Sequence, residues 1–171
     1  MSRLAVFVVS LSVAVSAVTP HLASAADPAD HSSVIDEAGG RVAFHYADGT
    51  VAVYHRGHER PIVTIQGPQR IDRLLLSGDT LVASGPDGVW IWRAGTGELI
   101  QRLIPSDPLV LSEDGRHLAT GSLLFEVGIL QPIAAWPAAS AVAFSDDGAR
   151  VATLHGDHAV LREVPEPIEV R

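Results

Sequence analysis

The chain has 171 residues, of which 47% are hydrophobic and 19% charged, so it suits one domain or one small repeat array with a buried core. Its formal net charge is -8, with 20 acidic residues against 12 basic ones, all arginine, which disfavours nucleic acid and anionic lipid as partners. Cysteine is absent, which excludes disulfides, thiolate catalysis, thiolate metal sites and lipid attachment through an N-terminal cysteine.

The segment 1–26 has the pattern of a secretory signal peptide. Met1-Ser2-Arg3 supplies a short positive start, residues 4–18 are apolar apart from three serines, and Ala23-Ser24-Ala25 offers the small residues that a signal peptidase reads. An apolar run of roughly 15 residues is too short to span a bilayer, which needs about 20, so we expect cleavage after Ala25 or Ala26. The mature protein is therefore predicted to be secreted or periplasmic, from a bacterium, and free of the membrane.

From residue 32 onward the pattern predicts many short strands and no helix. Apolar and other side chains alternate over residues 42–46, 51–54 and 89–92, as in strands with two distinct faces. Breaks such as Asp48-Gly49 and Asp87-Gly88 predict hairpin turns, because glycine tolerates the positive φ of tight turns.

A strand that ends in alanine recurs four times along the chain, at Ala43, Ala83, Ala119 and Ala152. Each alanine is preceded by an apolar segment and followed by two further apolar runs, the last of which are residues 61–65, 99–104, 133–136 and 167–170. Four strands that recur with a period of about 40 residues or slightly less make the blade of a β-propeller. We therefore predict an all-β propeller of about four four-stranded antiparallel blades, at roughly 32–67, 68–105, 106–138 and 139–171.

Three segments resemble the WD-repeat family. Residues 111–122 (LSEDGRHLATGS) differ in one position from that family's LSPDGRHLATGS segment, residues 144–148 are similar to its FSPDG turn, and residues 83–92 to its ASGSxDGxVxxW. The repeat lacks the family's Gly-His dipeptide, and Arg93 follows Trp92 where the signature aspartate would stand, so the family's side-chain network is incomplete. The resemblance covers residues 32–171 and implies a propeller that binds a protein or peptide partner.

Four blades is the lower limit for a closed ring. The sequence leaves open a small closed ring, an open arc, one half of an eight-blade homodimer, or a fragment of a larger propeller without an independent role. No spare N-terminal strand is apparent to complete the last blade. An open arc would expose apolar blade faces and favour pairing with a second copy.

Two histidine pairs are the candidates for a metal site. They are His55 with His58 and His155 with His158, the second pair flanking Asp157. Both pairs fall in or near turns without a third or fourth ligand in view, so no metal or cofactor is predicted. A propeller hydrolase with a metal in the central channel is the alternative function, and the apolar inner strands at 74–76, 109–111 and 142–144 disfavour it.

The other candidate groups have folding explanations. Acidic pairs stand beside glycine at equivalent turns, where aspartate is favoured for geometry, at Asp36-Glu37, Glu113-Asp114 and Asp146-Asp147. The remaining candidates are predicted to serve the repeat, packing, a turn or a solvated surface: Ser84, Ser122, Trp90, Trp92, Trp136, Gly95-Thr96-Gly97, Arg56, Arg60, Arg70 and Arg73. No catalytic, cofactor-binding or metal-binding residue is assigned, and we expect a binding or scaffold module rather than an enzyme.

Overall fold

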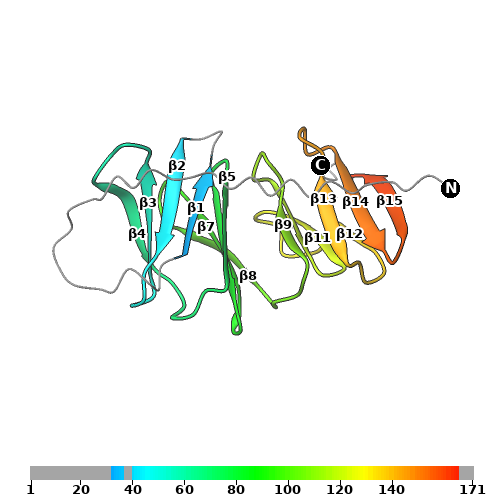
Figure 1. Ribbon diagram of the computed structural model, residues 1–171, viewed down its shortest axis with the longest axis horizontal. Coiled ribbons are helices and arrows are strands. Elements are labelled where there is room, and N and C mark those ends of the chain that lie inside the picture. The colour runs from blue at the N-terminus through cyan, green and yellow to red at the C-terminus, as the bar shows by residue number, and fades with distance from the viewer. Residues whose placement is uncertain (1–31, 37–39, 166–171) are drawn as a thin grey trace, which may run out of the picture.

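The computed structural model describes residues 32–36 and 40–165, and these fold into strands and turns with no helix. The described residues form fifteen strands in four antiparallel sheets, and within each sheet the strands that follow one another in the chain pair with each other (Figure 1). The predicted signal peptide and the predicted last strand at 167–170 lie outside the described residues. Within those residues no helix is long and apolar enough to cross a membrane.

The four sheets follow one another along the chain. The first consists of β1 (Ser32–Asp36), β2 (Arg41–His45), β3 (Thr50–His55) and β4 (Pro61–Gln66). The second consists of β5 (Arg73–Ser77), β6 (Thr80–Gly85), β7 (Gly88–Arg93) and β8 (Leu99–Leu103). The third consists of β9 (Leu109–Leu111), β10 (His117–Thr120), β11 (Leu123–Glu126) and β12 (Ala134–Ala135). The fourth consists of β13 (Ala141–Phe144), β14 (Arg150–His155) and β15 (His158–Glu163).

Both predicted hairpin turns are confirmed. Gly49 has φ 83° and the Asp48 carboxylate accepts the Thr50 N–H at 2.9 Å, so the side chain closes the turn between β2 and β3. Gly85 pairs with Gly88, which leaves a two-residue turn between β6 and β7. The turn residues thus fix the register of these hairpins from the local sequence.

The sheets stack face to face around their first strands. Strand β5 contacts β1 and β9, and β9 in turn contacts β13, so the first strands lie side by side while later strands extend outward. One apolar cluster fills each of the three junctions, with Leu81 buried between the first and second sheets, Leu118 between the second and third, and Val151 between the third and fourth. Burial of these faces supplies the main apolar stabilisation of the array.

Register identifies equivalent positions in the four sheets and corrects one repeat assignment. The residues that face the following sheet from the second strand are Ala43, Val82 and Ala119, and the matching residue of the fourth sheet is Ala152. Ala83 instead faces the first sheet, so the prediction that it matches Ala43 was wrong by one residue. The physical reason is the shorter turn in this sheet, where Ser77 pairs directly with Thr80.

The array is open at its ends. Among the described strands, the main contacts between sheets join neighbouring sheets, and the first and fourth sheets lie at opposite ends of the described part of the molecule (Figure 1). In the fourth sheet, five of the six residues of β15 are exposed. Each end therefore presents a sheet face that no other described sheet covers.

Candidate functional site

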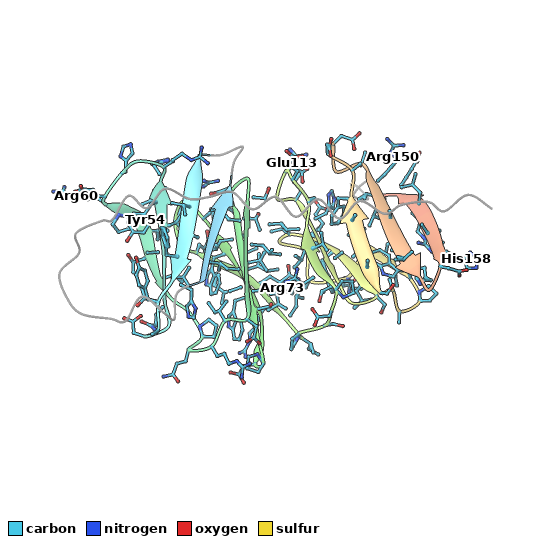
Figure 2. The ribbon with its side chains drawn as sticks, in the orientation of Figure 1. Tyr54, Arg60, Arg73, Glu113, Arg150 and His158 are labelled. Atoms are coloured by element: carbon cyan, nitrogen blue, oxygen red, sulfur yellow. The ribbon has the colours of Figure 1, made fainter. Side chains whose placement is uncertain are left out.

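A cavity of about 370 Å³ lies at the junction between the second and third sheets. Three segments that are distant in the sequence line it, namely Asp72 and Arg73 at the start of β5, Ser84, Gly85, Pro86 and Val89 of the β6–β7 hairpin, and Pro105, Ser106, Asp107 and Leu109 from the β8–β9 connection and the start of β9. Figure 2 labels Arg73 near this junction. Most of the residues that line the cavity, Arg73 and Asp107 among them, are exposed, so it is an open cleft at the surface.

Local sequence explains how these segments approach one another. A Cβ atom at Gly85 would collide with the backbone carbonyl of Arg70, so only glycine lets the hairpin lie against the strand entry. On the other side, the Thr120 hydroxyl donates to the Ser106 carbonyl at 2.8 Å and ties the connection between β8 and β9 to the third sheet. The walls of the cavity are therefore anchored to two different sheets.

The floor of the cavity is apolar and its mouth is charged. Val89 and Leu109 are buried, at 1% and 2% exposure. At the mouth, Nη1 of Arg73 lies 3.7 Å from Oδ1 of Asp107, and their side chains are 46% and 89% exposed. An ion pair that long and exposed contributes little to stability, so both charges are available to a ligand. Asp72 is more closely engaged, with Nε of Arg70 at 2.9 Å.

The four arginines predicted to be scattered solvated charge, residues 56, 60, 70 and 73, lie in two separate places. Arg70 and Arg73 each meet a carboxylate beside the cavity. Arg56 and Arg60 are exposed in the connection between β3 and β4, away from it. The structure thus gives Arg73 a position at a cavity that the sequence did not suggest.

The two histidine pairs do not converge with further ligands. The rings of His55 and His58 lie 5.7 Å apart, edge to face. His158 lies 3.1 Å from the exposed carboxylate of Asp157, whereas Nδ1 of His155 contacts the Ala138 carbonyl at 3.0 Å. Among the described residues no group of three or more His, Cys, Asp or Glu side chains is placed to hold a metal ion.

His155 is more than a solvated loop residue, because it belongs to a polar cluster in the fourth sheet. Its Nε2 lies 2.9 Å from Oγ1 of Thr153, which also accepts from Nη1 of Arg162 at 2.7 Å. Thr153 is only 1% exposed. The hydroxyl is therefore shielded from a substrate, and the cluster serves to satisfy buried polar groups.

The acidic turns have the structural role that their spacing predicts. The Ser112 hydroxyl donates to Oδ1 of Asp114 at 2.6 Å, and the Arg116 N–H donates to the same oxygen at 3.0 Å. Ser145 and Asp147 repeat the first bond at 2.5 Å in the next sheet. Asp36 and Glu37, the third pair, lie where the structure describes no side chains.

Hydrogen bonding in these turns lowers the pKa of both aspartates. For Asp114, burial raises the pKa, but the bonds from Ser112 and Arg116 outweigh it, and the pKa lies below its usual value. For Asp147, the Ser145 hydroxyl and then the Ala149 N–H lower the pKa. Both carboxylates therefore stay ionised near neutral pH, as hydrogen-bond acceptors that close a turn.

The other candidates mostly pack or turn as expected. Trp92 and Trp136 are buried at 4% and 6% exposure, and the guanidinium of Arg102 lies 4.9 Å from the centroid of half-buried Trp90. Residues 95–97 form the turn between β7 and β8, where the Gly97 N–H donates to the Arg93 carbonyl at 2.8 Å. The backbone carbonyl of Ser122 accepts a hydrogen bond from the backbone N–H of Trp136.

Ser84 and the residues around Asp107 are what sequence reasoning missed. Ser84 was explained by the repeat alone, yet it lines the cavity together with Pro105, Ser106 and Asp107. The connection between β8 and β9 carries no motif, and it meets Ser84 only through the stacking of two sheets. A signal for this site would have required the three-dimensional register of neighbouring repeats.

Comparisons with known proteins show a shared fold and no shared family. No protein-family model and no curated protein matches the chain. By contrast, 453 chains of solved structures match this chain in fold. The fold is therefore a common one that does not by itself select an activity.

Three solved structures illustrate the likeness. The computationally designed Ika8 protein is 22% identical with a TM-score of 0.54, over 72% of this chain and 43% of that one. The computationally designed Ika4 protein is 19% identical with a TM-score of 0.54, over 74% and 86% of the two chains. A eukaryotic initiation factor is 17% identical with a TM-score of 0.64, over 86% of this chain and 44% of that one. The chain thus spans less than half the length of two of these proteins, and the likeness is one of fold alone.

Proposed function

We propose that this chain is an exported β-propeller module of the WD-repeat type that binds a segment of another protein. The repeated blade-like sheets with adjacent first strands support the propeller assignment, as does the likeness in fold to solved structures. The observation that carries the binding role is the cavity between the second and third sheets, with its exposed prolines and its weakly paired charges.

The chemistry of the cavity favours a partner segment that is basic and partly apolar. Pro86 and Pro105 line the cavity and are exposed, so they offer apolar contact, while Asp107 is the most exposed charge at the mouth. A cationic side chain of the partner would displace Arg73 from a long ion pair at little cost. The net charge of -8 would steer a basic partner toward the protein and repel an acidic one.

Peptide selection from a random display library tests this proposal. We expect peptides selected on the purified protein to be enriched in arginine or lysine beside an apolar residue. Substituting Asp107→Lys should raise the Kd of such peptides at least tenfold, because it reverses the charge at the mouth. Asp157→Lys is the matched control, since that carboxylate is also 89% exposed and weakly ion-paired but belongs to the fourth sheet.

Equal binding to both variants would contradict the assignment of the site. Failure to select any basic peptide would contradict the proposed partner chemistry. Export is tested separately by N-terminal sequencing of the chain recovered from a bacterial culture, which should begin at Ala26 or Asp27. A mature chain that still begins at Met1 would contradict the predicted signal peptide.

A further inference from the structure

The outer face of the fourth sheet is an exposed apolar surface. It is the face turned away from the third sheet, and the register of β13–β15 assigns residues to it in rows across the strands. Its apolar residues are Ala141, Ala143, Ala152, Leu154, Ala159 and Leu161. Leu161 is 61% exposed, although leucine is a residue that folded proteins usually bury.

The same row of positions is buried in every other sheet. It pairs Ala43 with Val53 in the first sheet, Val82 with Ile91 in the second and Ala119 with Leu124 in the third. All six of these side chains are 0% exposed, because each row packs on the following sheet. The fourth member of the series is Ala152 with Leu161, and the described residues form no following sheet for it to pack on.

The first sheet presents the complementary half of such a junction. Its face turned away from the second sheet carries Val42 opposite Tyr54 and Phe44 opposite Ala52. Phe44 and Tyr54 meet edge to face with ring centroids 5.7 Å apart. Val42 and Phe44 are half-buried, whereas Ala52 and Tyr54 are 3% and 9% exposed, so Val42 and Phe44 carry most of the apolar surface that this face leaves open. In the later sheets the positions equivalent to Val42 are Leu81, Leu118 and Val151, and each packs on the preceding sheet.

We propose that the outer face of the fourth sheet binds the free face of the first sheet of a second copy. A dimer formed in this way closes both open ends at once, because each copy contributes one half of each new junction, and two chains complete a ring of eight sheets. The pairing repeats a junction that the chain already makes three times internally. The charged pair on the fourth-sheet face adds no net charge to the junction, because Arg150 lies directly opposite Glu163.

A partner of another kind would fit these faces less well. The face of the fourth sheet is built largely from alanines, so its backbone is close to the surface and suits the close approach of another sheet. The first-sheet face, where the rings of Phe44 and Tyr54 lie edge to face, supplies the larger side chains. The same pairing of a small side chain with larger ones occurs at the third junction, where Ala119 packs in one cluster with Val142 and Val151.

Sedimentation equilibrium of the protein recovered from expression of the complete sequence tests the proposal. We expect a dimer at micromolar concentration, and Leu161→Glu should raise the dimer Kd at least tenfold by placing a charge in the junction. Leu130→Glu is the control, because Leu130 is 77% exposed but lies between β11 and β12, away from this face. A monomer at all concentrations, or equal weakening by both variants, would overturn the proposal.

Thiol cross-linking distinguishes head-to-tail pairing from other dimers, since the chain has no native cysteine. Val42→Cys and Ala152→Cys occupy the positions that share one cluster at each internal junction. A short bifunctional thiol reagent should cross-link an equimolar mixture of the two single variants, and neither variant alone. Efficient cross-linking of Ala152→Cys to itself would mean that two fourth sheets face each other and would overturn the assigned pairing.

Discussion

Two leucines at equivalent positions in neighbouring sheets allow a direct test of the packing scheme. Leu124 in β11 and Leu161 in β15 pair with Ala119 and Ala152, but Leu124 is 0% exposed and Leu161 is 61% exposed. Leu124→Ala should lower the free energy of unfolding by about 3 kcal/mol, the middle of the range for buried leucines. Leu161→Ala should cost less than about 1 kcal/mol in dilute solution, because most of its surface is already exposed there.

Urea unfolding followed by tryptophan fluorescence measures both values, with Trp136 in the same apolar cluster as Leu124. An unchanged m-value in each variant would show that the cooperative unit is the same, which is a necessary check for a repeat array. If Leu124→Ala and Leu161→Ala lowered the free energy of unfolding by amounts that agree to within about 0.5 kcal/mol, the result would refute the different burial of these two equivalent positions. In concentrated protein the cost of Leu161→Ala should rise, since dimerisation would bury this side chain.

Three further predictions concern polar groups. Thr80→Val should cost about 1–2 kcal/mol in urea unfolding, because it removes the buried bond from the Thr80 hydroxyl to the Gly115 carbonyl (2.7 Å), whereas the exposed control Thr64→Val should be near neutral. The lowered pKa of Asp114 adds stability that is present above pH 3.8, the ordinary pKa, and is lost as pH falls through the folded-state pKa. Asp114→Asn should therefore weaken the dependence of the free energy of unfolding on pH in the acid range. Burial and then the hydrogen bond with Tyr54 raise the pKa of Tyr46 to about 12. The contribution of Tyr46 to the free energy of unfolding should therefore be present below pH 10 and lost as pH rises from 10 to 12. Tyr46→Phe should remove this alkaline dependence, and an unchanged alkaline limb would contradict the assignment.

Local signals were sufficient to predict the strands and turns. The alternation over residues 42–46 and the Asp48-Gly49 turn depend on neighbours in the sequence, and the structure has β2, a turn and β3 there. The repeat spacing also predicted an all-β chain of stacked units. The one-residue error at Ala83 arose because a shorter hairpin turn shifts the register, and composition does not reveal turn length.

The candidate site could not be predicted, for a different reason. Asp107 belongs to a connection without a motif, and Arg73 to a segment that reads as ordinary surface charge. They meet at 3.7 Å only because the second and third sheets stack through clusters such as that around Leu118. Contacts of this kind depend on the angle between sheets, which no pattern within one repeat encodes.

Distances between spin labels on the first and last sheets test the central structural claim most directly. Labels at Thr64→Cys and Ala143→Cys would stand on the two free faces, at positions that are exposed within one copy. In doubly labelled protein diluted into unlabelled protein, pulsed electron resonance should give one long intramolecular distance, as expected for an open array with these sheets at opposite ends (Figure 1). A short distance within one chain would show that four sheets close on themselves and would contradict the account.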